Sequence, residues 1–325
     1  KSVNRTIKAI ISKEKIGIDL QTLNEKILRV VDKFTNQTEK KSMDENNLKD
    51  VYDALVLGTK DYVEKNNFKG VLIGSSGGID SALTAAIAFD ALGKGRVKTI
   101  MMPFDFTADI SIEDAGSLAK NLGIEHSEIS IKEMYESFSL ALKESFEGMG
   151  IDKTEENLQS RCRGVTLMAL SNKLGFLVLT TGNKSEAAVG YSTLYGDTAG
   201  GFSVLKDVSK TLVYELANYR NSLSVVIPKR IIERPPSAEL APDQKDTDSL
   251  PDYDRLDPII EMYVEDDKSI QEIINEGFDE KEVRRIVSLI DFNEYKRRQA
   301  PLGIKISDRN FGKDRRYPIT NSWKP

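Results

Sequence analysis

The sequence contains one cysteine and one histidine in 325 residues, and it has no long apolar run. A single thiol, Cys162, cannot form a disulfide within the chain, and scarce cysteine is typical of a reducing compartment. No stretch of about 18 or more apolar residues occurs, so we expect no membrane-spanning helix. The basic start lacks the apolar core and the cleavage site of a signal peptide. These absences predict a cytoplasmic protein without a membrane partner.

The scarcity of histidine also limits the chemistry. His126 is the only histidine, and it lies on a weak strand pattern. Acid–base or nucleophilic catalysis that depends on an imidazole is therefore disfavoured. Arginines on both sides of Cys162 could lower the pKa of its thiol, but because no histidine partner is apparent we interpret this cysteine as structural.

Charges of one sign are not in excess. The chain has 46 Lys and Arg against 51 Asp and Glu, which gives a formal charge of -5 and a pI near 5.3. Binding to a phosphate backbone requires clustered basic residues, so we expect no nucleic-acid partner. The length is enough for one large domain, or for one domain with an appendage.

Residues 18–34 have apolar side chains at helical spacing, and the polar run 35–46 is typical of a linker. We therefore predict an N-terminal extension over residues 1–47 and a single domain over residues 48–325. In that domain apolar strand patterns alternate with helical ones, which predicts an α/β fold with a doubly wound parallel sheet and helices on both faces. The expected strands are 71–74, 97–104, 124–129 and 176–182, and the expected helices are 81–92, 112–122 and 154–175.

Residues 233–254 are rich in Pro, Asp and Ser and show no regular pattern. A loop of this length is usually a functional lid or is disordered. Two helices are expected beyond it, around 253–264 and 279–298, followed by a basic tail.

The strongest local signal is GVLIGSSGGIDSAL, residues 70–83, which predicts a buried strand, a Gly-rich turn and a helix. Backbone N–H groups at such a turn bind anions, yet Asp80 lies there. The turn lacks the lysine of a Walker A loop. A Mg²⁺ ion between Asp80 and bound phosphates would explain the carboxylate. The alternative is that Asp80 simply caps the helix.

Residues 76–81, SGGIDS, resemble the pyrophosphatase loop of the N-type ATP pyrophosphatases, which have an adenine nucleotide α-hydrolase-like fold. Three further segments, 180–217, 233–254 and 294–319, resemble those of NAD synthetases, and the similarity spans roughly residues 48 to 320. The resemblance implies that ATP, deamido-NAD and ammonia yield NAD, AMP and pyrophosphate. Adenylation of the nicotinate carboxylate would create the leaving group that ammonia displaces.

The resemblance also implies roles for particular residues. Asp80 and Glu186 match Mg²⁺ ligands, and together with Lys210 they match the catalytic group. Taken alone, Glu186 would be read as a solvated loop residue and Lys210 as a surface lysine, although a lysine at a helix start is unfavourable for the helix dipole. The residues implied to bind ATP are Gly74, Ser75, Ser76, Gly77, Gly78, Ile79, Asp80, Ser81, Thr181, Lys210 and Ser237.

A second implied set contacts deamido-NAD. Arg161 and Arg163 are two residues apart, so on a helix they point about 200° from each other. We favour Arg161 as the contact and interpret Arg163 as a salt-bridge residue. The residues of this set are Asn157, Arg161, Glu186, Tyr191 and Lys296.

One position departs from the ammonia-using members of the family: Leu194 stands where they carry a lysine. The tail resembles the glutamine-dependent, two-domain members, whose glutaminase domain cannot fit before residue 48. We therefore expect either the synthetase part of a longer protein or a form that uses free ammonia. The resemblance also implies a homodimer. Two alternatives remain: another ATP pyrophosphatase ligase with a different acceptor, and a non-catalytic nucleotide-binding subunit of a glutaminase.

Overall fold

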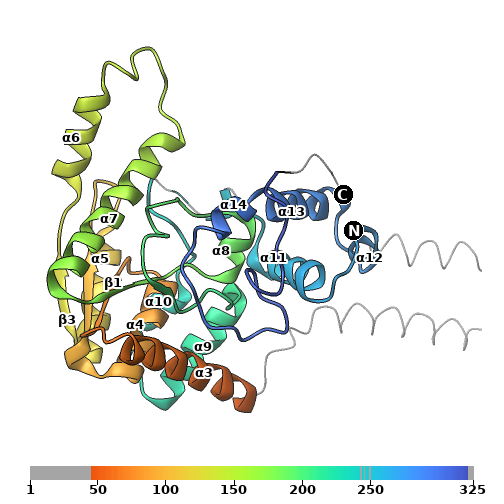
Figure 1. Ribbon diagram of the computed structural model, residues 1–325, viewed down its shortest axis with the longest axis horizontal. Coiled ribbons are helices and arrows are strands. Elements are labelled where there is room, and N and C mark those ends of the chain that lie inside the picture. The colour runs from red at the N-terminus through yellow and green to blue at the C-terminus, as the bar shows by residue number, and fades with distance from the viewer. Residues whose placement is uncertain (1–44, 242–243, 245, 249, 321–325) are drawn as a thin grey trace, which may run out of the picture. The chain divides into compact units, whose positions relative to one another are not determined.

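The computed structural model describes residues 45–241, 244, 246–248 and 250–320, which belong to one compact unit (Figure 1). The predicted helix 18–34 and the linker 35–46 fall outside the described residues, apart from the two last positions of the linker. The first described helix, α3, begins at Glu45, three residues before the predicted domain boundary.

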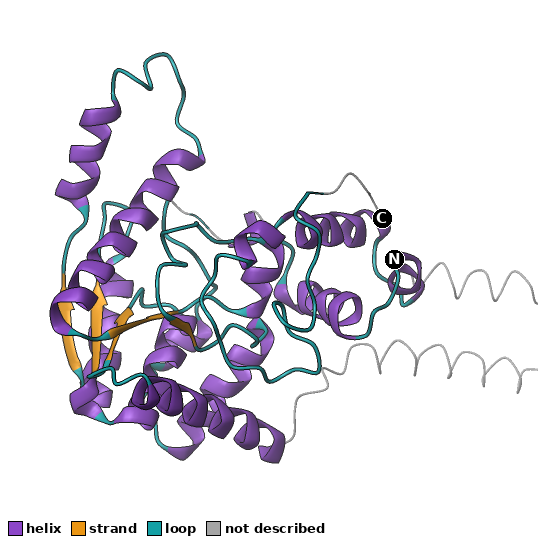
Figure 2. Cartoon of the chain, viewed as in Figure 1, coloured by secondary structure: helices purple, strands orange, loops and turns teal. Residues whose placement is uncertain are grey.

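A five-stranded parallel sheet lies at the centre of the unit, with strand order β3-β2-β1-β4-β5 (Figure 2). The predicted doubly wound α/β fold is confirmed. The four predicted strands all form, and each is shorter than or equal to its predicted range. The two-residue β5 was not predicted. The strands are β1 (Val71–Gly74), β2 (Val97–Met101), β3 (Glu125–Glu128), β4 (Leu177–Thr180) and β5 (Phe202–Ser203).

The central strand β1 shows why the sheet is covered on both faces. Val71 and Ile73 pack into one apolar cluster with α3, α4, α5 and α9, whereas Leu72 packs into a second cluster under α7. Successive strand residues point to opposite faces, so an uninterrupted apolar run requires helices on both. Figure 1 shows α4 and α7 on either side of the strands. The helices of this part are α3 (Glu45–Lys65), α4 (Ile79–Leu92), α5 (Asp109–Leu122), α6 (Lys132–Leu142), α7 (Lys153–Leu174), α8 (Lys184–Val189), α9 (Lys210–Leu223) and α10 (Lys229–Glu233), with a 3-10 turn at Lys94–Arg96.

The helices end where the sequence predicts. Gly123 and Gly175 follow α5 and α7 in the left-handed conformation, which glycine adopts without strain. At the N-terminus of α7, Asp152 and Glu155 form a capping box. Helix α3 was not predicted from its sequence pattern.

A third apolar cluster holds the C-terminal helices together. Both predicted helices of this region form, but each is interrupted: α11 continues into a π-helical turn, and Asn293 separates α13 from α14. No helix in the part of the chain that the structure describes is both long and apolar enough to cross a bilayer. The elements are a 3-10 turn at Asp246–Asp248, α11 (Tyr253–Ile260), the π-helical turn Glu261–Glu265, α12 (Ile270–Asn275), α13 (Glu280–Phe292) and α14 (Glu294–Arg297).

Candidate functional site

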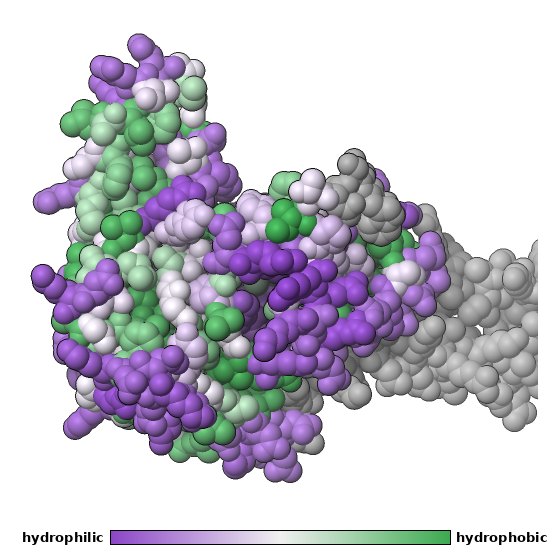
Figure 3. Space-filling view, viewed as in Figure 1, coloured by the Kyte–Doolittle hydropathy of each residue, from purple (hydrophilic) through white to green (hydrophobic). Residues whose placement is uncertain are grey.

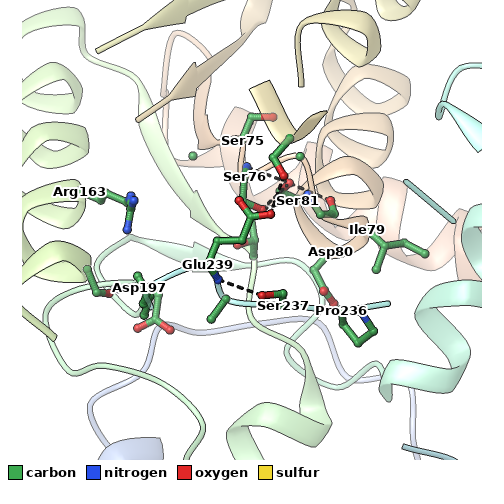
Figure 4. Close-up of a pocket in the computed structure, with 18 of the residues that line it drawn as sticks. Ser75, Ser76, Ile79, Asp80, Ser81, Arg163, Asp197, Pro236, Ser237 and Glu239 are labelled. Carbon is green, nitrogen blue, oxygen red and sulfur yellow. Dashed lines mark hydrogen bonds between the residues drawn. The ribbon is translucent and has the colours of Figure 1, made fainter. Parts of the chain in front are cut away.

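A cavity of about 280 Å³ lies at the carboxyl ends of β1, β2 and β4. Strand β1 pairs with β2 on one side and with β4 on the other. The strand order reverses between these two strands: the chain proceeds from β1 to β2 and β3 on one side and from β4 to β5 on the other. Such a switch point is where ligands bind in folds of this kind. The cavity is bounded by the Gly-rich loop, one side of α7, the start of α9 and the loop that follows α10 (Figure 4).

The Gly-rich loop is held against the start of α5. Gly77 has a φ of 76°, and a Cβ at this position would lie 2.3 Å from the carbonyl oxygen of Ser111. Only glycine satisfies both conditions. Within the loop, the Ser81 hydroxyl donates to the carbonyl oxygen of Gly78 at 3.0 Å and accepts from the backbone N–H of Ser76 at 3.2 Å. These hydrogen bonds within the loop fix its shape.

Asp80 is not the helix cap. Gly78 occupies the cap position of α4, and Asp80 is the second residue of the helix, so the capping alternative is wrong. Its carboxylate instead accepts from Lys210 Nζ at 2.5 Å and from Asn183 Nδ2 at 2.9 Å. Residues from α4, α8 and α9 thus meet at this carboxylate.

Glu186 reaches the same ammonium group. Its Oε1 lies 3.5 Å from Lys210 Nζ. One ammonium group therefore contacts the carboxyl groups of both Asp80 and Glu186. Glu186 also closes a capping box with Asn183 at the start of α8. The NKSE segment therefore positions Glu186 by local helix chemistry, and the solvated-loop interpretation is wrong.

The surroundings of these groups perturb their protonation. Burial, assisted by the charge of Asp80, raises the pKa of Glu186 to about 8, although Lys210 opposes the shift. Burial alone would lower the pKa of Lys210, but the charges of Asp80 and Glu186 raise it above its ordinary value. Lys210 is 2% exposed, so it is not a surface lysine.

The carboxylate pair suits a divalent cation only in part. Carboxylate oxygens are the ligands that Mg²⁺ prefers, usually one or two of them beside phosphate oxygens and water. Among the described residues, no group of three or more acidic, His or Cys side chains is arranged to hold a metal ion. Asp80 and Glu186 therefore fit a Mg²⁺ ion whose remaining ligands come from a bound polyphosphate and water.

The cavity lining is acidic overall. Its five carboxylates are those of Asp80, Glu186, Asp197, Glu239 and Asp246, and its three cations are those of Arg163, Lys210 and Arg234. Such a lining repels a polyphosphate unless cations accompany it.

The loop after α10 covers one side of the cavity, as the lid interpretation of residues 233–254 predicts. Ser237 lines the cavity, and its hydroxyl donates to the carbonyl oxygen of Gln244 at 2.5 Å. Glu239 fastens the loop: its carboxylate accepts from the Ser111 hydroxyl at 2.7 Å and from Arg234 at 2.5 Å. Figure 4 shows Ser237 and Glu239 on the same loop. Positions 242, 243, 245 and 249 lie outside the described residues.

Asp246 is a residue that the sequence analysis missed. It is 4% exposed, lines the cavity, and accepts from the hydroxyl groups of Tyr253 at 2.9 Å and Tyr191 at 3.3 Å. Burial raises the pKa of its carboxyl group, which Lys210 partly offsets. No sequence signal singles it out within an irregular loop that contains several aspartates.

The residues implied to bind ATP all line the cavity, whereas only some of those implied to bind deamido-NAD do. Asn157, Arg161 and Lys296 are not in the lining, although Glu186 and Tyr191 are. Lys296 Nζ donates to the carbonyl oxygens of Gly190 and Ser192, both at 2.7 Å. These assignments stay predictions.

Helix α7 presents a different arginine to the cavity from the one we favoured. Arg163 is in the lining, and its Nε donates to the carbonyl oxygen of Met102 at 3.0 Å rather than to a carboxylate. Arg161 is exposed and donates to the carbonyl oxygen of Leu194. Between them, burial raises the pKa of the Cys162 thiol, contrary to the expected effect of its arginine neighbours.

Comparison with known proteins connects this geometry to a family. The family model described as NAD synthase matches residues 51–300. A glutamine-dependent NAD(+) synthetase of Acinetobacter baylyi is 56% identical over 278 residues, covering 85% of this chain and 51% of that protein. The chain spans about half the length of the curated relatives it matches.

Two solved structures are similar as well. The glutamine-dependent NAD+ synthetase of Acinetobacter baumannii, in complex with ADP, is 52% identical with a TM-score of 0.57, covering 84% of this chain and 50% of that one. The NMN synthetase of Francisella tularensis is 30% identical with a TM-score of 0.65, covering 77% of this chain and 95% of that one.

Proposed function

The chain belongs to the NAD synthase family, and from this premise we propose that it converts deamido-NAD to NAD with ATP and ammonia, releasing AMP and pyrophosphate. The observation that carries the proposal is the convergence of Asp80 and Glu186 on Lys210 beside the Gly-rich loop at the switch point of the sheet. The bound ADP of the Acinetobacter baumannii relative supports an adenine nucleotide in this cavity.

The first step forms an acyl adenylate. A carboxylate oxygen of the nicotinate ring attacks the α-phosphorus of ATP, the bond between the α-phosphorus and the bridging oxygen breaks, and pyrophosphate leaves. The N–H groups of the Gly-rich loop that make no bond within it, with the Ser76 hydroxyl, hold the phosphates of the leaving group, and the Ser81 hydroxyl keeps the loop in shape. Lys210 neutralises negative charge that develops between Asp80, Glu186 and the phosphates.

The second step forms the amide. Ammonia attacks the carbonyl carbon, the bond from that carbon to the AMP oxygen breaks, and AMP leaves while the nitrogen loses a proton. The chain's contribution is to hold the two reactants in line and to exclude water, because water would hydrolyse the adenylate. The loop carrying Ser237 and Glu239 supplies that cover.

Mg²⁺ is the metal whose chemistry fits Asp80 and Glu186. When bound, it would neutralise the polyphosphate and orient it for displacement. The carboxylates of Asp80 and Glu186 would hold it, with the remaining positions left to phosphate oxygens and water.

A mononucleotide acceptor is the second candidate. The NMN synthetase of Francisella tularensis is covered over 95% of its length, so nicotinate mononucleotide is the alternative to deamido-NAD. The decisive assay supplies ATP, Mg²⁺ and ammonium with either acceptor, and measures NAD, NMN and AMP. We expect NAD and AMP in equal amounts with deamido-NAD. Preferential NMN formation would favour the second candidate, and no AMP with either acceptor would contradict both.

The names and lengths of the relatives bear on the nitrogen source. Those relatives are glutamine-dependent, and the chain spans about half of them. We propose that ammonia comes from a glutaminase domain or subunit, so the chain by itself should use ammonium chloride and not glutamine. Equal rates with both donors would contradict this proposal.

A homodimer is also proposed. Apolar side chains are exposed along the arm formed by α6 and the following turn, including Phe138, Leu140, Met149 and Ile151 (Figure 3). Exposed apolar patches of this kind mark interaction sites. Sedimentation should give a dimer that Leu140→Asp with Ile151→Asp dissociates, and a monomeric wild-type chain would contradict the proposal.

A further inference from the structure

One cation of the cavity has no charged partner. Lys210 pairs with Asp80 and Glu186, and Arg234 pairs with Glu239 at 2.5 Å. Arg163 is the remaining cation of the lining. Among the described residues, no carboxylate lies within ion-pair distance of it, and its one hydrogen bond is the Nε contact to the carbonyl oxygen of Met102.

The guanidinium of Arg163 is held through its Nε, and the N–H donors on its two terminal nitrogens make no hydrogen bond among the described residues. A guanidinium has five N–H donors, of which the Nε–H is one. With Nε held 3.0 Å from the end of β2, the two terminal nitrogens retain all their donors. Burial lowers the pKa of Arg163 to about 10, and the charges of Cys162 and Glu239 offset this effect only in part. A half-buried cation whose charge is only partly compensated gains from an anionic ligand.

Close packing keeps Arg163 at the cavity. A Cβ at the next residue, Gly164, would lie 2.8 Å from the carbonyl oxygens of Tyr195 and Gly196, so at this position α7 lies directly against the backbone of the loop before Asp197. Asp197 N–H in turn donates to the Ser160 hydroxyl on α7 at 3.0 Å. Figure 4 shows Arg163 and Asp197 on one side of the cavity and Ser75, Ser76 and Ser81 on another. A reactant on the Gly-rich loop would therefore face Arg163.

We propose that Arg163 binds an anionic group of the reactants through its terminal nitrogens, either a phosphate of the nucleotide or the carboxylate of the acceptor. A planar fork of two N–H donors matches the oxygens of both groups. The proposal rests on the proposed function for the identity of the acceptor. Arg163 would then be a fixed cation in an otherwise acidic cavity. Because it is not paired with a carboxylate, a bound anion would not have to break an ion pair to reach it.

The test measures the affinity of the full chain for two probes separately, α,β-methylene-ATP with Mg²⁺ and deamido-NAD. Arg163→Met should weaken binding of one probe about 10- to 100-fold, the loss expected for a charge-assisted hydrogen-bonded pair. Arg163→Lys should recover only part, because the fork is lost. Lys173→Met is the matched control: it removes an exposed cation from the same helix, outside the cavity, and should change neither affinity.

The probe that is weakened identifies the anion. Loss confined to α,β-methylene-ATP assigns a phosphate, and loss confined to deamido-NAD assigns the carboxylate. Wild-type affinity for both probes in a folded Arg163→Met chain would overturn the proposal. If that variant does not fold, Arg163→Gln, which keeps an amide donor near Met102 but no charge, takes its place with the same expected loss. A wild-type chain that binds the nucleotide but forms no NAD would refute the proposed function alone.

Discussion

Two buried lysines in this molecule begin a helix, and their surroundings differ. Lys184 starts α8 and Lys210 starts α9; they are 3% and 2% exposed. A positive charge is unfavourable at a helix N-terminus, so both need anionic partners. Lys184 has Glu265 at 2.6 Å, Asp207 at 2.9 Å and the hydroxyl of Ser307 at 2.9 Å.

The partners decide what each lysine does. Those of Lys184 come from the segment after β5, from the π-helical turn and from the C-terminal tail, and Lys184 does not line the cavity. Its ammonium joins three parts of the fold. The partners of Lys210, Asp80 and Glu186, open onto the cavity. Burial and helix position alone therefore do not reveal function; the accessibility of the partner carboxylates to a ligand does.

The largest effect should come from Lys210→Met. The variant keeps the length of the side chain but removes the ammonium that Asp80 and Glu186 share, and NAD formation should fall about 100- to 1000-fold, as for other preorganised electrostatic groups. Thermal unfolding should change little, because a proton or a solution cation can reach the two carboxylates from the cavity. Initial rates and calorimetry check both statements. Activity of Lys210→Met within tenfold of wild type would contradict the claim that Lys210, unlike Lys184, takes part in the reaction.

Lys184→Met should have the opposite signature. Asp207, which is 2% exposed, would be left buried without its cation and Glu265 would lose its partner, which should lower the free energy of unfolding by about 3–5 kcal/mol. The rate per folded molecule should remain within about threefold of wild type, since no reactant touches this lysine. The matched control is Lys229→Met, whose exposed pair with Glu233 is screened by solvent, so its loss should leave the stability nearly unchanged.

A smaller effect is expected from Tyr253→Phe. This change removes the hydroxyl that donates to Asp246 but keeps the ring, whose centroid lies 5.3 Å from Lys210 Nζ. Losing one hydrogen bond costs about 1 kcal/mol, so we expect the KM for ATP to rise roughly fivefold. Tyr263→Phe, which loses a hydroxyl contact to Asp291 away from the cavity, is the control. Equal KM values in the two variants would show that the loop carrying Asp246 does not depend on Tyr253.

The smallest effect concerns His126, a half-buried base whose pKa is lowered, whereas that of Lys210 is raised. Burial lowers the pKa of His126 from its ordinary value of 6.5, and its Nε2 has no partner. The folded state therefore binds a proton less readily than the unfolded chain does. Stability should be fully present above pH 6.5 and decrease as the pH falls below it. His126→Asn should show a flatter decrease in melting temperature between neutral and mildly acidic pH; parallel curves would contradict this account.

Much of the fold follows from local patterns, because apolar runs and glycine stops are visible in the sequence. Val71, Leu72 and Ile73 specify a strand buried on both faces, and Gly123 ends its helix where expected. Helices α3, α6, α8, α10 and α12 and the short β5 were not predicted, since their form depends on packing against the rest of the unit.

The candidate site was predictable only where a motif marks it. The helical spacing of Arg161 and Arg163 shows that they face apart, but not which of them faces the cavity; that depends on how Gly164 packs against the 195–196 backbone. Likewise, the position of Lys210 at a helix start does not reveal that two carboxylates from other segments bury it.

The central claim is that Asp80 and Glu186 jointly hold a magnesium ion with the nucleotide. The most direct measurement is the affinity for α,β-methylene-ATP with excess Mg²⁺ and again with EDTA, for the wild-type chain, Asp80→Asn and Glu186→Gln. We predict that Mg²⁺ strengthens wild-type binding at least about tenfold, because the ion offsets the repulsion between the polyphosphate and the carboxylates, and that this ratio approaches one in both variants. An unchanged ratio in folded Asp80→Asn and Glu186→Gln would contradict the claim.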